Sequence, residues 1–128
     1  MAPRPLVHVL GLCNVVAGAL LVVAPGAFAP LDGASSPAAR LLGLSAAVLL
    51  WAIAVGGWQL PRTASRPYLW IFGVVVKVIA AAMWGAAAVL AGVPMLWLGA
   101  VADLAVAAVI ISGLRGEAWS GRRLGTPG

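Results

Sequence analysis

Hydrophobic residues fill this chain in four long runs, separated by short stretches that contain proline, glycine or charged residues. The runs cover residues 6–24, 38–60, 68–91 and 95–114. Each approaches or exceeds the roughly 20 residues that an α-helix needs to cross a hydrocarbon core about 30 Å thick. Their periodicity is weak, which is typical of helices that are apolar on every side. The pattern predicts four membrane-spanning helices.

Proline and glycine define the ends of the predicted helices. Four prolines stand at the beginnings of the runs: Pro5, Pro37, Pro67 and Pro94. Proline suits a first helical turn because its φ is already helical and its missing N–H has no partner there. We expect helices near 5–24, 37–60, 67–91 and 94–114. Together they form an all-α membrane protein, an antiparallel four-transmembrane-helix bundle, in a single domain that covers 1–114.

The composition supports burial in lipid. Hydrophobic residues make up 63% and charged residues 9%, whereas soluble domains have about half and a quarter respectively. The net charge of +5 does not predict a nucleic-acid partner, since that would need a connected basic patch. The basic residues fall in the gaps between apolar runs, as membrane topology requires. The expected partner is the lipid bilayer.

The arginines orient the predicted helices. One side of the membrane receives the N-terminus, the loop 61–66 and the C-terminal segment, with six arginines: Arg4, Arg62, Arg66, Arg115, Arg122 and Arg123. The other side receives Arg40. Because positive residues stay in the cytoplasm, we expect both termini to be cytoplasmic. We also expect 115–128 to form a mobile basic tail.

The first run has an alternative interpretation as a cleaved signal peptide. Arg4 precedes it, and Ala27-Phe28-Ala29 has the small residues of a cleavage site. Pro30 would then follow the cut directly, where signal peptidases do not accept proline. We therefore expect the first run to remain as a helix.

Polar residues inside the runs are the candidate site. An ionised group at a helix centre costs about 2.5–3.5 kcal/mol on insertion scales, so it usually faces protein or water. At 1.5 Å per residue, Lys77 and Asp103 lie roughly 16–18 Å from the cytoplasmic arginines, and Asn14 lies roughly 14 Å beyond Pro5. Three helices thus place a polar side chain in one layer. Trp84, seven residues after Lys77, lies on the same helix face and either caps this cluster or packs in the core.

The pairing of Lys77 with Asp103 is uncertain from sequence, although glycines four residues away mark both faces as helix contacts. Side chains lean toward the N-terminus of their helix, so these two lean in opposite directions. Counted from the Gly92–Val93 turn, their depths also differ by roughly 10 Å. A direct pair therefore needs the full lysine stem or a bridging water. The cluster is either a structural ion pair or a site for a substrate, proton or lipid headgroup.

Other chemistry has no support in the sequence. Cys13 has no second cysteine to pair with. One histidine and one cysteine are too few for a zinc site. We find no catalytic motif, and we expect neither a metal nor a cofactor.

The layout resembles that of DoxX-like bacterial inner-membrane proteins, which are small four-helix chains with a longer loop after the first helix. The resemblance covers 5–114 and rests on this layout and on Gly73–Lys77 and Pro94–Asp103. It implies a location in the bacterial inner membrane and carries over no catalytic residues, since that group has no single activity. Small multidrug transporters differ, because their first helix carries a glutamate where this chain has Asn14.

Three functions are consistent with these features. The first, which we favour, is a non-enzymatic accessory protein or subunit that packs with another membrane protein or with further copies of itself. The second is a small oligomeric transporter or channel that uses Lys77 and Asp103. The third is a quinone- or lipid-linked membrane redox protein.

Overall fold

The computed structural model describes residues 4–23, 37–92 and 94–124, and the regular elements in these ranges are all helical. They are α1 (Arg4–Val23), α3 (Pro37–Gln59), the 3₁₀ turn η1 (Arg62–Ala64), α4 (Ser65–Tyr68), the π-helical segment η2 (Leu69–Val75), α5 (Val76–Ala91) and α6 (Leu96–Leu124). Four stretches are long and apolar enough to cross a membrane: Arg4–Val23, Arg40–Gln59, Arg62–Leu90 and Leu96–Gly116. The all-α class with four candidate membrane spans is therefore confirmed.

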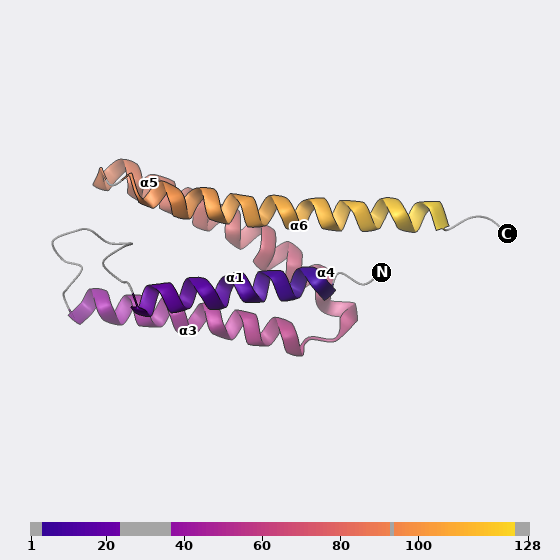
Figure 1. Ribbon diagram of the computed structural model, residues 1–128, viewed down its shortest axis with the longest axis horizontal. Helices are drawn as coiled ribbons and strands as arrows, with labels where there is room; N and C mark the ends of the chain where they lie inside the picture. Colours follow the sequence, from indigo (N-terminus) through magenta and orange to yellow (C-terminus); the bar gives the residue numbers. More distant parts are fainter. Residues whose placement is uncertain (1–3, 24–36, 93, 125–128) are drawn as a thin grey trace.

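The four long helices associate as two antiparallel hairpins (Figure 1). α1 packs along α3, and α5 packs along α6. The hairpins meet near α4 and diverge toward the opposite end of the molecule (Figure 1). The core lies at this meeting point and consists of Val7, Leu10, Tyr68, Leu69, Val74, Ile110 and Leu114.

Two glycines let the hairpins approach each other at the meeting point. A Cβ atom at Gly73 would lie 2.5 Å from Cδ1 of Ile110 and 3.4 Å from Cδ2 of Leu10. A Cβ atom at Gly113 would lie 2.6 Å from Cδ1 of Leu6. The contact of Gly73 with Ile110 lies within the second hairpin, whereas those of Gly73 with Leu10 and of Gly113 with Leu6 join that hairpin to α1. Small residues allow such close contacts between membrane helices.

Within each hairpin, tryptophan rings lie on glycines of the facing helix. In the first hairpin Trp58 covers Gly11 and Trp51 covers Gly18, so that a Cβ at either glycine would lie 2.5 Å from the indole nitrogen. Trp51 also donates a hydrogen bond from Nε1 to the carbonyl of Val15, at 3.1 Å. The second hairpin repeats the arrangement, with Trp97 on Gly85 and Trp84 on Gly99. Close approach and dispersion contacts hold membrane helices together, and these pairs supply both.

Polar side chains tie the end of α3 to its neighbours. The Arg4 guanidinium donates hydrogen bonds to the carbonyls of Leu60 at 2.8 Å, Trp58 at 2.7 Å and Gly57 at 3.4 Å. The last carbonyls of a helix have no partner within it, and a cation there also suits the helix dipole. Tyr68 of α4 donates a hydrogen bond from its hydroxyl to the carbonyl of Ile53, at 2.6 Å. Arg4 therefore caps α3.

Some helix ends match the sequence prediction and others differ. α3 begins at Pro37 as predicted, and Gly92 ends α5 in a left-handed conformation with φ of 65°, which glycine adopts without strain. The third helical stretch begins at Arg62, ahead of Pro67, and α6 begins at Leu96, two residues after Pro94.

The largest difference is the end of α6, which continues to Leu124 instead of ending near 114. Gly113 and Gly116 each weaken a helix by only about 1 kcal/mol relative to alanine. Alanine, glutamate and arginine, which are good helix formers, follow them. The mobility of this segment stays a prediction. The alternative cleavage site around Pro30 lies outside the described residues.

Candidate functional site

Lys77 of α5 and Asp103 of α6 form a direct ion pair. Nζ of Lys77 lies 2.8 Å from Oδ1 of Asp103, and the two side chains are 9% and 15% exposed. The sequence predicts that Lys77 and Asp103 differ in depth by roughly 10 Å, but that count assumes parallel helix axes. α5 crosses α6 at an angle (Figure 1), so each residue of α5 advances along the α6 axis by less than the 1.5 Å helical rise. The flexible lysine side chain spans the distance that remains between the two residues.

The ion pair leaves hydrogen-bonding capacity unused. An ammonium group has three donors, and a carboxylate accepts through two oxygens. Within the described ranges, Lys77 and Asp103 hydrogen-bond only to each other. In hydrocarbon no water is available, and each unsatisfied polar group costs several kcal/mol. The pair is therefore incompletely satisfied at this depth.

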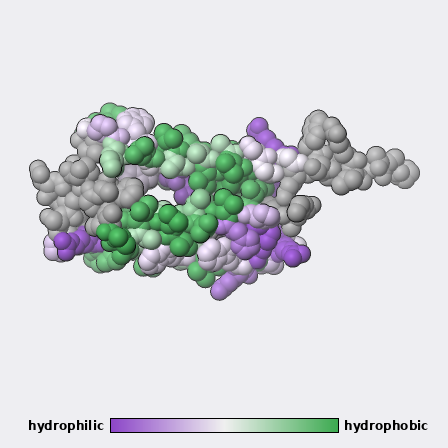
Figure 2. Space-filling model, in the orientation of Figure 1, coloured by the Kyte–Doolittle hydropathy of each residue, from purple (hydrophilic) through white to green (hydrophobic). Residues whose placement is uncertain are grey.

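The exposed part of the ion pair faces a cleft between the two hairpins, which we call the inter-hairpin cleft. It encloses about 390 Å³ and is lined by Leu12, Cys13, Val16, Ala17 and Leu20 of α1, Lys77 of α5, and Ala102, Asp103 and Val106 of α6. Figure 2 shows a hollow between the hairpins with hydrophobic walls and hydrophilic surface at its depth. The cleft thus joins an apolar wall to one charged pair.

Asn14 lies in the predicted layer but outside the cleft lining. It is 2% exposed, and its Oδ1 atom has no hydrogen-bond partner in the described part of the chain. Leu10, one turn earlier on α1, contacts the position of Gly73, which is one turn before Lys77. Asn14 and Lys77 therefore lie one turn beyond the meeting point on helices that run in the same direction. The structure brings Lys77 and Asp103 together and leaves Asn14 beside them, buried.

Trp84 contacts α6 and is absent from the residues that line the cleft. A Cβ atom at Gly99 would lie 3.1 Å from Cδ2 of Trp84. The side chain is half-buried and fills space between α5 and α6. This contact is compatible with core packing, and the role of Trp84 as a cap on the polar cluster stays a prediction.

The π-helical segment η2, which sequence reasoning missed, ends at Val75, two residues before Lys77. π-helical turns are rare and frequently lie at functional sites. This one places Leu69, Gly73 and Val74 in the buried core and sets the direction in which Lys77 leaves the helix. Its residues are apolar, like those of the surrounding helix, so the sequence carries no signal for it.

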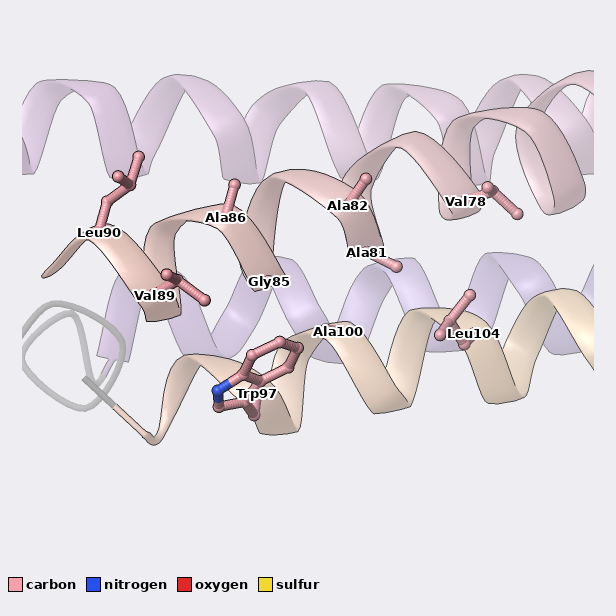
Figure 3. A pocket seen from close by; sticks show the side chains of 10 residues that line it. All are labelled: Val78, Ala81, Ala82, Gly85, Ala86, Val89, Leu90, Trp97, Ala100 and Leu104. Carbon is pink, nitrogen blue, oxygen red and sulfur yellow. The ribbon is translucent and has the colours of Figure 1, made fainter. Parts of the chain in front are cut away.

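A second opening lies on the hairpin of α5 and α6, and we call it the α5–α6 groove. It is a shallow groove with a volume of about 690 Å³, and its lining residues are Val78, Ala81, Ala82, Gly85, Ala86, Val89 and Leu90 of α5 and Trp97, Ala100 and Leu104 of α6. In Figure 3, Trp97 projects from α6 toward α5 opposite Gly85, where a Cβ atom would lie 3.2 Å from its ring. The lining residues include no titratable side chain, and the indole N–H of Trp97 is their one side-chain polar group.

Comparisons with known proteins add no relative: no family model, no curated protein and no solved structure matches this chain. The resemblance to DoxX-like proteins therefore stays a prediction. Among the described residues, no group of three or more His, Cys, Asp or Glu side chains could hold a metal ion.

Proposed function

We propose that this chain is a non-enzymatic accessory protein or subunit of the bacterial inner membrane, and that the α5–α6 groove receives a transmembrane helix of its protein partner. The observation that carries this proposal is the lining of the groove. Five of its residues are alanine or glycine: Ala82 and Ala86 are exposed, whereas Ala81, Gly85 and Ala100 are buried. Small residues let helix backbones approach closely, which is how transmembrane helices associate in lipid.

The walls of the groove suit a helix better than a reacting substrate. Val89 and Leu90 are 69% and 87% exposed, and Trp97 is 49% exposed. These side chains can pack around an inserted helix by dispersion, which is the main attraction between helices in lipid. A catalytic site usually needs titratable or nucleophilic groups in its lining, and the lining of the groove has none of these.

We propose the orientation with both termini in the cytoplasm. Arg4 at the start of α1, Arg62 in η1 and Arg66 in α4 lie on elements at the same end of the molecule (Figure 1). The C-terminal part of α6, which contains Arg115, extends toward that end. Arg40, near the start of α3, lies at the other end. This asymmetry agrees with the rule that positive residues are retained on the cytoplasmic side.

Photocrosslinking in native membranes tests the accessory function. A photoreactive amino acid replaces Val89 in the groove or, as a matched control, Val48, which is 60% exposed on α3 and lies outside the groove. We expect a discrete protein adduct from position 89 and only lipid adducts from position 48. Mass spectrometry identifies the partner, and a mass of twice this chain identifies a second copy.

A substitution that fills the groove completes the test. Ala86→Leu places a larger side chain in the groove and should abolish the adduct from position 89. Ala52→Leu, at an exposed position of α3, should leave it unchanged. The same adduct yield from positions 89 and 48, or an adduct insensitive to Ala86→Leu, would contradict the proposal. The transporter and redox alternatives stay predictions, because nothing in the geometry favours either over packing.

A further inference from the structure

The inter-hairpin cleft is chemically different from the α5–α6 groove, because an ion pair lies in its wall. Its volume of about 390 Å³ falls within the range of roughly 300–1,000 Å³ that is typical of small-molecule sites. The Lys77 and Asp103 side chains together use one hydrogen bond. An occupant made only of hydrocarbon would leave the other donors and acceptors without partners, which is costly away from water.

Water alone is a poor occupant of this cleft. A water molecule between Lys77 and Asp103 would have the two polar partners that a buried water needs, but it would leave the apolar part of the cleft unfilled. In the lining, Lys77 and Asp103 are the only residues with charged or amide groups, and the α1 wall is apolar apart from the Cys13 thiol. Leu12, Val16 and Leu20 are 61%, 51% and 45% exposed. The cleft therefore suits a molecule with one polar end and a long apolar part.

The charges of Lys77 and Asp103 determine which polar group of a bound molecule fits the cleft. Lys77 and Asp103 neutralise each other, so a head with a net charge would add an uncompensated charge in a medium of low dielectric constant. A hydroxyl group can hydrogen-bond to both members of the pair. Its oxygen accepts a hydrogen bond from the ammonium, and its O–H donates one to the carboxylate. A group that only accepts hydrogen bonds satisfies half of the site.

We propose that the inter-hairpin cleft binds a neutral lipid with a free hydroxyl group in its head, such as a monoacylglycerol. The hydroxyl bridges Nζ of Lys77 and a carboxylate oxygen of Asp103, and the acyl chain lies along Leu12, Val16 and Leu20. The site is separate from the α5–α6 groove, and it does not depend on a protein partner.

The test uses the full chain, reconstituted in phosphatidylcholine vesicles that contain a trace of monoacylglycerol with a diazirine in its acyl chain. After illumination, we expect peptide mapping to place the label on residues 12–20 of α1 and 102–106 of α6. Unlabelled monooleoylglycerol should compete at least about tenfold better than methyl oleate, which has the same tail and no hydroxyl, since one hydrogen bond of about 1.4 kcal/mol is worth that factor. Anionic phosphatidylglycerol should compete as weakly as methyl oleate.

Two pairs of variants locate the site. Lys77→Met combined with Asp103→Leu removes both charges together, so that no unpaired charge remains buried; labelling should fall roughly tenfold, and the preference for the hydroxyl should disappear. Ala102→Leu fills the cleft without altering the pair and should also reduce labelling. Its matched control, Ala105→Leu, changes an exposed alanine of α6 outside the cleft and should have no effect.

Three results would overturn the proposal. They are equal competition by methyl oleate and monooleoylglycerol, equal labelling of the unaltered chain and the double variant, and labelling spread evenly over the exposed helix faces. If the double variant does not fold, two experiments still test the proposal. They are the lipid competition on the unaltered chain and the labelling of the Ala102→Leu and Ala105→Leu variants. Ala86→Leu should leave lipid labelling intact, so that a failure of the proposed accessory function is distinguishable from a failure of this site.

Discussion

Lys77 and Asp103 are charged residues within apolar helices, where burying a charge costs free energy. Either group alone at this depth would be a buried, unpaired charge, and the hydrogen bond of 2.8 Å between them removes that state. Replacing both partners of a buried ion pair is often neutral, whereas removing one costs about 3–5 kcal/mol. The stability of the second hairpin therefore depends on the pair as a unit.

A double-mutant cycle tests that dependence. Lys77→Ala should lower the free energy of unfolding in detergent by about 3–5 kcal/mol, because it leaves the Asp103 carboxylate unpaired. Exchanging the charges, with Lys77→Asp and Asp103→Lys in one chain, should restore part of the loss. Val76→Ala, at an exposed neighbouring position, serves as the control. Thermal or denaturant unfolding followed by tryptophan fluorescence measures the effect, and purely additive single effects would show that the two side chains are not coupled.

At the scale of the helices, each hairpin depends on aromatic rings that lie on glycine. The two glycines of α1, Gly11 and Gly18, are seven residues apart, and so are Trp51 and Trp58 of α3. This shared spacing sets the register of the two antiparallel helices. The second hairpin exchanges the roles, since α5 and α6 each supply one glycine and one tryptophan. Shape therefore defines the register of α1 and α3, together with the hydrogen bonds that Arg4 and Trp51 donate across this helix pair.

Two glycine-to-alanine substitutions separate this packing from helix propensity. Gly18→Ala would place a Cβ atom 2.5 Å from Nε1 of Trp51, so we expect a loss of roughly 1–3 kcal/mol in the free energy of unfolding from overpacking. Gly56→Ala meets nothing within 4 Å and should gain up to about 1 kcal/mol from helix propensity. Unfolding in detergent measures both. Equal effects of the two substitutions would show that the tryptophan contact does not define the register.

At the scale of the whole molecule, the two hairpins meet at one end and diverge at the other (Figure 1). This arrangement creates the inter-hairpin cleft, while the α5–α6 groove belongs to one hairpin alone. The two openings differ in chemistry, because one contains an ion pair and the other has no titratable group in its lining. A protein helix and a lipid with a polar head can therefore occupy the same chain at separate places.

Cysteine accessibility tests the orientation of the molecule in the membrane. In a Cys13→Ala background, Thr63→Cys lies in η1 and Met95→Cys lies in the turn before α6, and both positions are exposed. If both termini are cytoplasmic, an impermeant thiol reagent added to intact cells should modify position 95 and spare position 63. Inverted membrane vesicles should give the opposite pattern. Modification of position 63 from outside would show that the protein is inserted the other way round.

The sequence by itself determined that the chain has four apolar helices, because span length and hydrophobicity are local properties of consecutive residues. It also identified Pro37 and Gly92 as helix ends and Lys77, Asp103 and Asn14 as one polar layer, since proline, glycine and axial rise act along a single helix.

The tertiary structure decided what these residues contact. Helix tilt made the ion pair direct, and Asn14 is buried with no hydrogen-bond partner for its Oδ1 atom among the described residues. The π-helical segment, the tryptophan–glycine register and the divergence of the hairpins also emerged only there. Each depends on how surfaces of separate helices fit together, and similar apolar residues carry no signal of that fit in sequence order.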